Sequence, residues 1–223
     1  MSQKRGLAKR YLVFLIGVVI NSFGIALITK AALGTSPISS VPYVLSLQFS
    51  PTLGEFTLAI NMVFILLQVL LLRRKFQLIQ LLQIAVNVIF SYFIDISMNL
   101  LQWLNIDNYF LQLLALVLGC TVLAFGINLE VAPKVLMVPG EGVVYAISET
   151  VHQEFGTVKV AFDVTLMATA AVLSLVFFHQ FNGIREGTVI SAVLVGLIVK
   201  FFQKHLTFLS RILGEKGDGV GAG

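Results

Sequence analysis

The sequence contains little charge and a single cysteine. Lys, Arg, Asp and Glu together make up 12% of its 223 residues, about half of the ~25% that is typical of a soluble domain. So little charge argues against a water-soluble protein. Cys120 has no second cysteine with which to form an intrachain disulfide, and we expect it to be a small buried residue.

Sequence motifs of common enzymes are missing as well. The chain has no phosphate-binding Gly-Lys-Ser/Thr loop, so we expect no ATP hydrolysis. His152, His179 and His205 are far apart and do not have the spacing of a metal site. No Ser/His/Asp or Cys/His group is supported by its sequence context. We therefore expect a protein that is not an enzyme and that has neither a cofactor nor a metal.

Apolar residues make up 57% of the chain, and the mean hydropathy is +0.94. Six runs approach or exceed the ~20 residues that cross a bilayer, and two shorter helices lie between them. The shorter helices would rise only about 20 Å at ~1.5 Å per residue, less than the ~30 Å hydrocarbon core. This pattern predicts an all-α polytopic membrane protein. The expected spans are 11–30, 55–72, 79–102, 109–129, 157–178 and 187–203, and the short helices are 37–49 and 139–152.

Each short helix follows a break in the apolar pattern, at residues 31–36 and 130–138, and a proline, Pro37 or Pro139, suits the first turn of each helix. The two breaks belong to an internal repeat. When residues 12–61 are compared with the residues 102 positions later, twelve are identical without a gap. The shared residues include Gly17 and Gly119, Gly24 and Gly126, Pro37 and Pro139, and Tyr43 and Tyr145. The sequence therefore predicts two related halves, each with a broken helix.

The distribution of Lys and Arg favours short helices that return to the side from which they came. With a cytoplasmic N-terminus, such re-entrant helices leave two basic residues outside and thirteen inside, whereas crossing helices leave six outside and nine inside. The positive-inside rule prefers the first arrangement. Each half then has three spans, so the halves are inverted repeats. The alternative is eight crossing helices in two parallel repeats.

These boundaries divide the chain into four parts. They are a basic cytoplasmic N-terminus (1–10), membrane repeat 1 (11–103), membrane repeat 2 (109–208) and a disordered cytoplasmic tail (209–223). The basic excess lies at the ends of apolar runs, where orientation signals belong, and not in a patch for nucleic acid. The expected partner is therefore the lipid bilayer, and homo-oligomerisation stays open.

In the re-entrant arrangement the N-termini of both short helices meet near the bilayer midplane. Their free N–H groups and positive dipole ends would form a polar site, because irregular backbone at that depth must be covered by protein or by a watery cavity. Two short helices that only fill space are the alternative. The expected site residues are Thr35, Ser36, Ser39, Ser40 and Tyr43 from the first half, and Gly140, Glu141, Gly142 and Tyr145 from the second.

Two equivalent positions carry the candidates for ion coupling. Asn61 and Asp163 lie about two turns into the spans that follow the short helices, and an ionisable residue at that depth is a functional candidate. Lys159, four residues earlier, is an alternative partner that would neutralise Asp163. Glu141 is either a structural cap, a proton carrier or a ligand for a cationic solute.

The segment Gly34-Thr-Ser-Pro-Ile-Ser-Ser-Val-Pro-Tyr43 resembles the YczE/YyaS/YitT-type bacterial integral membrane proteins, a largely uncharacterised family. Pro139-Gly-Glu-Gly142 and Gly187-Thr-Val-Ile-Ser-Ala192 fit the same pattern. The resemblance implies a multi-pass protein of the bacterial inner membrane. The family is usually described with about five spans, one fewer than the six counted here.

From these features the sequence suggests a secondary transporter for a small solute, with proton coupling through Glu141 or Asp163. A passive, aquaporin-like channel and a membrane accessory protein without transport are the alternatives. Coupled transport requires a titratable group within the membrane, which a passive pore does not.

The topology can be tested by cysteine accessibility in a Cys120→Ala background, with an impermeant thiol reagent. The re-entrant arrangement predicts labelling from outside at positions 50, 105 and 182, and labelling from inside at 75 and 153. Labelling of 50 and 105 from inside and of 75 from outside would show that the short helices cross. The single cysteines replace Ser50, Lys75, Asn105, Gln153 and Asn182.

Overall fold

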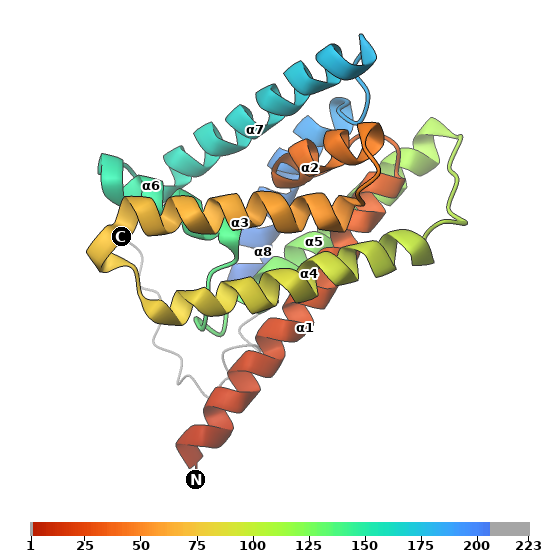
Figure 1. Cartoon of the computed structure of the whole chain (residues 1–223). Helices are drawn as coiled ribbons and strands as arrows, with labels where there is room; N and C mark the ends of the chain where they lie inside the picture. Colours follow the sequence, from red (N-terminus) through yellow and green to blue (C-terminus); the bar gives the residue numbers. More distant parts are fainter. Residues whose placement is uncertain (1, 206–223) are drawn as a thin grey trace.

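The computed structural model describes residues 2–205, with the side chains of all of these except residues 2–6, 74 and 78. This part of the chain forms eight α-helices and two 3-10 segments and contains no strand (Figure 1). The helices are α1 (Ser2–Lys30), α2 (Pro37–Gln48), α3 (Leu53–Leu72), α4 (Leu82–Leu100), α5 (Tyr109–Val131), α6 (Pro139–Val151), α7 (Phe155–Phe178) and α8 (Glu186–His205). The predicted all-α class is confirmed.

Six helices are long and apolar enough to cross a membrane, namely α1, α3, α4, α5, α7 and α8. Helices α2 and α6 have only 12 and 13 residues. The predicted six long and two short helices are therefore present. Some boundaries differ, because α1 already begins at Ser2 and a 3-10 turn (Leu78–Leu81) precedes α4. The predicted disordered tail (209–223) and the end of the second repeat (206–208) lie outside the described residues.

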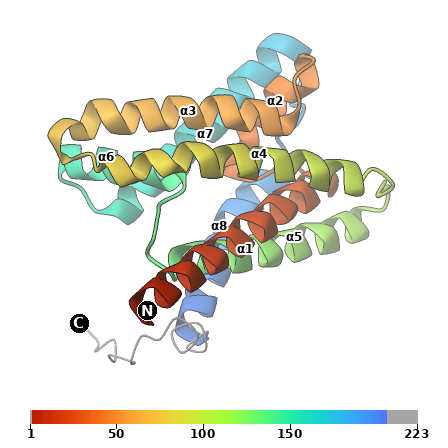
Figure 2. The same cartoon turned by 60° about the horizontal axis from the view of Figure 1, so that its bottom comes forward.

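Helices α1 and α5 cross in close backbone contact (Figure 2). A Cβ atom at Gly24 would lie 2.6 Å from the backbone nitrogen of Leu123, and one at Gly126 would lie 2.6 Å from that of Asn21. Toward the ends of the crossing, Gly17 meets Glu130. Early residues of α1 thus face late residues of α5, so the two helices are antiparallel. Small residues allow this approach, as is usual between helices in membranes.

The same crossing has an internal symmetry. The contact of Gly24 with Leu123 becomes that of Gly126 with Asn21 when each partner is replaced by the residue 102 positions away. Backbone angles agree in the same way. Ala32 and its counterpart Lys134 both have positive φ angles, 59° and 52°. Equivalent positions of the two halves therefore share contacts and local conformation.

The residues directly before the two short helices are equivalent as well. Ser36 and Val138, which stand directly before α2 and α6, have the same extended conformation, φ −69° and ψ 152°. Each is followed by a proline, Pro37 or Pro139, at the first helical position, where the missing N–H costs nothing. The sequence thus starts both short helices by the same local mechanism.

The first break is bound to the start of α8. The Gly187 amide donates to the Leu33 carbonyl at 2.8 Å, and the Thr35 amide donates to Thr188 Oγ1 at 3.2 Å. A side chain at Gly187 would collide with Leu33, since its Cβ would lie 2.5 Å from the Leu33 oxygen. These bonds satisfy the irregular backbone of residues 31–36, which lipid does not hydrogen-bond.

Helices α3 and α4 lie side by side and are tied together at one end (Figure 1). Asp95 on α4 accepts hydrogen bonds from Thr52 Oγ1 at 2.6 Å and from the Gly54 amide at 2.9 Å. Ser91 Oγ donates to the Gly54 carbonyl at 2.6 Å. Gly54 leaves room for this contact, because its Cβ would lie 2.5 Å from Asp95 Oδ2.

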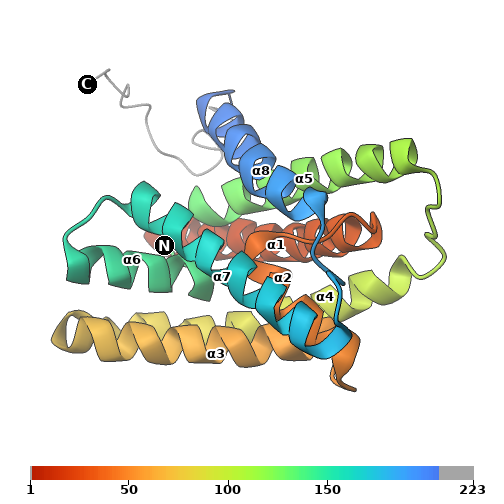
Figure 3. The same cartoon turned by 90° about the horizontal axis from the view of Figure 1, so that it is seen from above.

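The equivalent helices α7 and α8 are arranged differently. They diverge from the loop of residues 179–185 and make almost no contact with each other (Figure 3). Only 11% of the spanning window of α7 and 17% of that of α8 are buried, against 33% for α3 and for α4. The two halves therefore differ in how their last two helices pack.

Contacts of the short helices show which chain segments share one side of the bundle. The C-terminal end of α2 lies beside the α7–α8 loop, where a Cβ at Gly183 would meet Leu47 and the rings of Phe49 and Phe177 pack 5.5 Å apart. The end of α6 lies beside the segment after α3, through an ion pair of 3.7 Å between Lys75 and Glu149.

The close α1–α5 crossing predicts that Gly24→Ala lowers stability. In an open helix this change would gain up to about 1 kcal/mol, but here the new methyl group overlaps Leu123 and should cost roughly 1–3 kcal/mol. The matched control is Gly196→Ala, because a Cβ at Gly196 meets no atom within 4 Å. Unfolding of the purified protein in detergent measures both, and equal stability of the two variants would contradict the crossing.

Candidate functional site

The N-termini of α2 and α6 meet at the centre of the bundle and line one cavity of about 490 Å³. The contact between them is direct, since the Ile38 side chain occupies the space where a Cβ of Gly140 would lie. Helices α1, α3, α4, α5, α7 and α8 complete the wall. The predicted meeting of the two short helices is therefore found.

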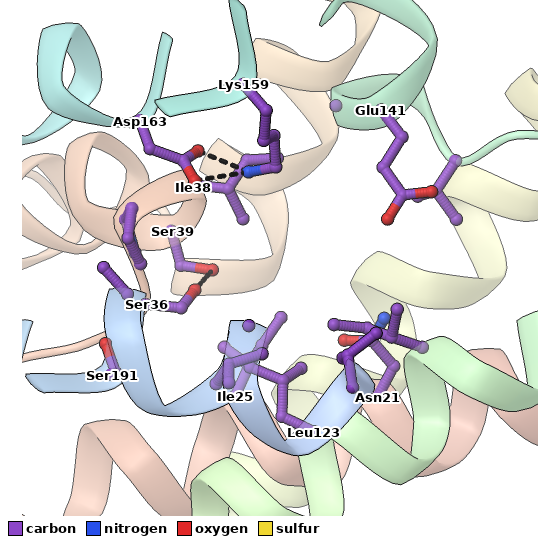
Figure 4. Close-up of a pocket in the computed structure, with 18 of the residues that line it drawn as sticks. Asn21, Ile25, Ser36, Ile38, Ser39, Leu123, Glu141, Lys159, Asp163 and Ser191 are labelled. Atoms are coloured by element: carbon purple, nitrogen blue, oxygen red, sulfur yellow. Dashed lines mark hydrogen bonds and ion pairs between the residues drawn. The ribbon is translucent and has the colours of Figure 1, made fainter. Parts of the chain in front are cut away.

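Neither helix start is capped by the side chain before it. Ser36 Oγ instead donates to Ser39 Oγ at 3.0 Å (Figure 4), and Ser40 Oγ donates to the Pro37 carbonyl at 2.6 Å. The positive dipole ends of both helices thus lie at the cavity without a side-chain cap. Ser36 and Ser39 line the cavity, whereas Ser40 does not.

Glu141 is the acidic residue of the α6 N-terminus. Its carboxylate points into the cavity, on the side where Asn21 lies (Figure 4). It forms no hydrogen bond or ion pair within residues 2–205. A hydrogen-bonded cap of the helix start by Glu141 is therefore not found within residues 2–205.

Asp163 and Lys159 form an ion pair on one face of α7, four residues apart (Figure 4). Both line the cavity, and their side chains are 19% and 30% exposed. The alternative partner considered for Asp163 is therefore present. In this pairing the charge of Asp163 is matched by that of Lys159.

Asn61, the position equivalent to Asp163, contributes an amide to the wall. Its Nδ2 donates to Asn87 Oδ1 at 2.8 Å, and Asn87 Nδ2 donates to the Leu58 carbonyl at 3.1 Å. These bonds join α3 to α4. Asn61 is 6% exposed, and it lines the cavity as a hydrogen-bonded residue.

Four further predicted residues lie away from the cavity lining, in addition to Ser40. Thr35 is buried and bonds to Thr29 at 2.9 Å. Tyr43 packs against the apolar cluster around α1 and α5, and Tyr145 is half-buried. Gly142 faces Gln68, to which its Cβ would come within 2.5 Å. These positions shape the helices that carry the site and do not reach its interior.

Glu130 is an acidic residue that the sequence prediction misplaced. It was assigned to the break, but α5 continues to Val131, so Glu130 lies in the last turn of α5 and is 3% exposed. Asn21 Nδ2 donates to its Oε1 at 2.8 Å, and it is near enough to Glu141 for their charges to interact. Its position at the end of an apolar run was the available signal.

Polar side chains within the apolar spans were also missed. Gln68 is fully buried and donates to the Pro139 carbonyl at 3.1 Å, which ties α3 to the start of α6. Gln83 exchanges bonds of 3.3 Å with Gln68. Asn21 and Ser191 line the cavity. Their polar character in spanning segments is a signal for interhelical bonding, which does not distinguish cavity residues from supporting ones.

Comparison with known proteins agrees with this membrane architecture. The chain is 25% identical over 199 residues to the "Uncharacterized membrane protein YczE" of Bacillus subtilis (strain 168), covering 89% of this chain and 87% of that protein. The predicted resemblance is thereby confirmed. No solved structure matches the chain. A profile for a family of unknown function matches residues 8–204, and by that match the chain belongs to this family, DUF6198.

Proposed function

We propose that this protein is a secondary transporter of a small solute, which binds in the cavity between the N-termini of α2 and α6. One observation carries the proposal. Two short helices from separate halves of the chain begin at the same cavity, and a carboxylate that forms no hydrogen bond or ion pair in the described part of the chain, Glu141, points into it (Figure 4). Broken helices that meet at a central site are a common feature of transporters.

The second element of the proposal is an inverted repeat. Because α1 and α5 are equivalent and antiparallel, the two-fold axis that relates them is perpendicular to both helices, and in a bilayer it lies in the membrane plane. The contact of Ile38 with its own counterpart, Gly140, supports an axis that passes through the cavity. Rocking of one half against the other would then expose the site to each side in turn.

The contacts at the ends of the short helices support the re-entrant arrangement. Leu47, near the end of α2, lies beside Gly183 of the α7–α8 loop, and Lys75 after α3 pairs with Glu149 at the end of α6. In the six-span topology each pair shares a side of the membrane. We propose that both termini lie in the cytoplasm, which the distribution of Lys and Arg supports, and that the protein belongs to the bacterial inner membrane.

Proton coupling is assigned first to Glu141. Its carboxylate has no bonded partner in residues 2–205, so protonation changes the charge of the cavity without breaking an existing bond. Asp163 takes a secondary role, because its charge is matched by Lys159. A solute that displaces Lys159 would free Asp163, which links solute binding to the charge state of the site.

We expect Glu141→Gln to fold normally and to lose pH-dependent solute movement. The change removes the titratable group but keeps the side-chain volume. The measurement is the current or dye response of proteoliposomes that receive a panel of small solutes under an imposed pH gradient. Glu149→Gln is the matched control, since it makes the same substitution on the same helix at a position that does not line the cavity.

Four results are informative. Loss of the pH dependence in Glu141→Gln and Asp163→Asn, with full activity of Glu149→Gln, supports coupled transport. Wild-type, pH-dependent movement in both cavity variants removes the proton-coupling assignment. Solute movement that never depends on a gradient identifies a passive channel, and absence of any movement for the whole panel identifies a role without transport.

The Lys159–Asp163 pair predicts strong coupling between two substitutions. Lys159→Met and Asp163→Asn each leave one charge without its partner beside the cavity, so the double variant should be more stable than the sum of the single changes implies, by about 1 kcal/mol. Unfolding in detergent measures this double-mutant cycle. Additive effects would show that the ion pair is absent in the membrane protein in solution.

A further inference from the structure

The cavity has an opening between α7 and α8. In the first half, Gly54 packs against Asp95 and Ile94 is fully buried, which closes the space between α3 and α4. The residues 102 positions after Gly54, Asp95 and Ile94 are Gly156, Leu197 and Gly196, respectively. A Cβ at either of these glycines would meet no atom within 4 Å. The divergence of α7 and α8 (Figure 3) therefore leaves the second half open where the first is closed.

This opening belongs to the cavity and has an apolar rim. The cavity lining includes Gly156 and Val160 from α7, and Val193, Gly196 and Leu197 from α8. Val160 is 65% exposed and Leu197 is 59% exposed. Both helices are candidates for membrane spans, and we propose that these exposed apolar side chains face hydrocarbon. A molecule in the bilayer thus has a direct apolar path to the site.

The interior of the same cavity is polar on a small part of its wall. Ser36, Ser39, Glu141 and the Lys159–Asp163 pair lie together at the ends of α2 and α6 and on α7 (Figure 4). Apolar side chains such as Ile25, Phe90, Leu123 and Ile127 line much of the rest. An apolar pocket with a few convergent polar groups fits a ligand that has an apolar body and one polar head.

The unpaired charges of the site favour a positive head. Within residues 2–205, Lys159 is bonded to Asp163, whereas Glu141 has no bonded partner and interacts with Lys159 only through its charge. Lys200 also lines the cavity, but it is exposed at the rim, where its charge is hydrated. The partial positive charges of the two helix N-termini also lie at this cavity. An amine or quaternary ammonium group placed beside Glu141 would nevertheless bring a full opposite charge into direct contact with this carboxylate.

We infer that the ligand is an amphipathic organic cation that enters from the bilayer between α7 and α8 and places its charged head beside Glu141. This inference rests on the proposed solute site and specifies its substrate class. It differs from transport through an aqueous path, because the opening described here faces the hydrocarbon and requires a ligand that dissolves in it.

Calorimetric titration of the protein in lipid nanodiscs tests the inference with three probes. Hexyltrimethylammonium has the apolar tail and the positive head, hexanesulfonate has the same tail with a negative head, and tetramethylammonium has the head alone. We expect binding of the first probe, after subtraction of its partition into empty nanodiscs, and at least about tenfold weaker binding of the other two. Equal binding of the ammonium and the sulfonate would overturn the inference.

Matched variants locate the bound probe. Glu141→Gln should weaken binding of hexyltrimethylammonium about tenfold, an effect between those of exposed and buried ion pairs, while Glu149→Gln leaves it unchanged. Gly196→Leu should obstruct the opening and slow or abolish binding, and Val189→Leu is its control on an exposed part of α8 outside the cavity lining. Val193→Phe is a second obstructing variant. Unchanged binding in well-folded Gly196→Leu and Val193→Phe would refute entry between α7 and α8.

A fluorophore on Val160→Cys in the Cys120→Ala background shows what covers the opening. Quenching by brominated lipids is expected if acyl chains reach it, whereas protection that depends on protein concentration would show a second copy of the chain there and would refute entry from the bilayer. The proposed transport function can be refuted independently of this inference. Binding of hexyltrimethylammonium without movement across proteoliposomes would remove transport and leave the site, and movement of solutes without binding of this probe would do the reverse.

Discussion

The backbone contact between α1 and α5 is the constraint on which the rest of the structure depends. Gly24 and Gly126 bring the two helices so close that neither position has room for a side chain. In a membrane, the association of helices gains little from the hydrophobic effect and relies on packing and hydrogen bonds. A crossing this close therefore fixes the angle and the register of the two halves, and α4 and α8 then pack on α1 and α5, respectively.

The short helices satisfy a second constraint that follows from the first. Each long helix of the crossing is followed by irregular backbone, and where lipid covers this backbone it must find hydrogen-bond partners in the protein. For the first break, Thr188 and Gly187 supply these bonds. Near the second, Gln68 binds the Pro139 carbonyl. The supports differ in chemistry, although the helices that they support begin with the same backbone angles.

Apart from the start of α1, which lies nine residues earlier than predicted, the sequence alone predicted the long and short helices to within a few residues, because apolar run length and the position of proline are local properties. It also predicted that Ser36, Ser39 and Glu141 would share a site, because the repeat placed them in the equivalent first turns of the two short helices. It did not separate Tyr43 and Tyr145 from the cavity lining, since side-chain direction depends on how helices rotate against one another. Glu130 was missed because the end of α5 lies two residues later than expected, which moved this residue from a loop into a buried helical turn.

The difference between the halves arises where their sequences diverge. Twelve identities link residues 12–61 to their counterparts, whereas in 79–103 only Ile96 and Ile198 coincide at the same offset. In α4, Asp95 and Ser91 bind Gly54, and their counterparts in α8, Leu197 and Val193, have no polar group with which to bind Gly156. Side chains at these two positions therefore cannot tie α7 to α8 in the way that α3 is tied to α4. The two segments share the crossing and the helix breaks but differ in this link, so one pair of helices is closed and the other open, and we propose that the open pair gives the central cavity its contact with the bilayer.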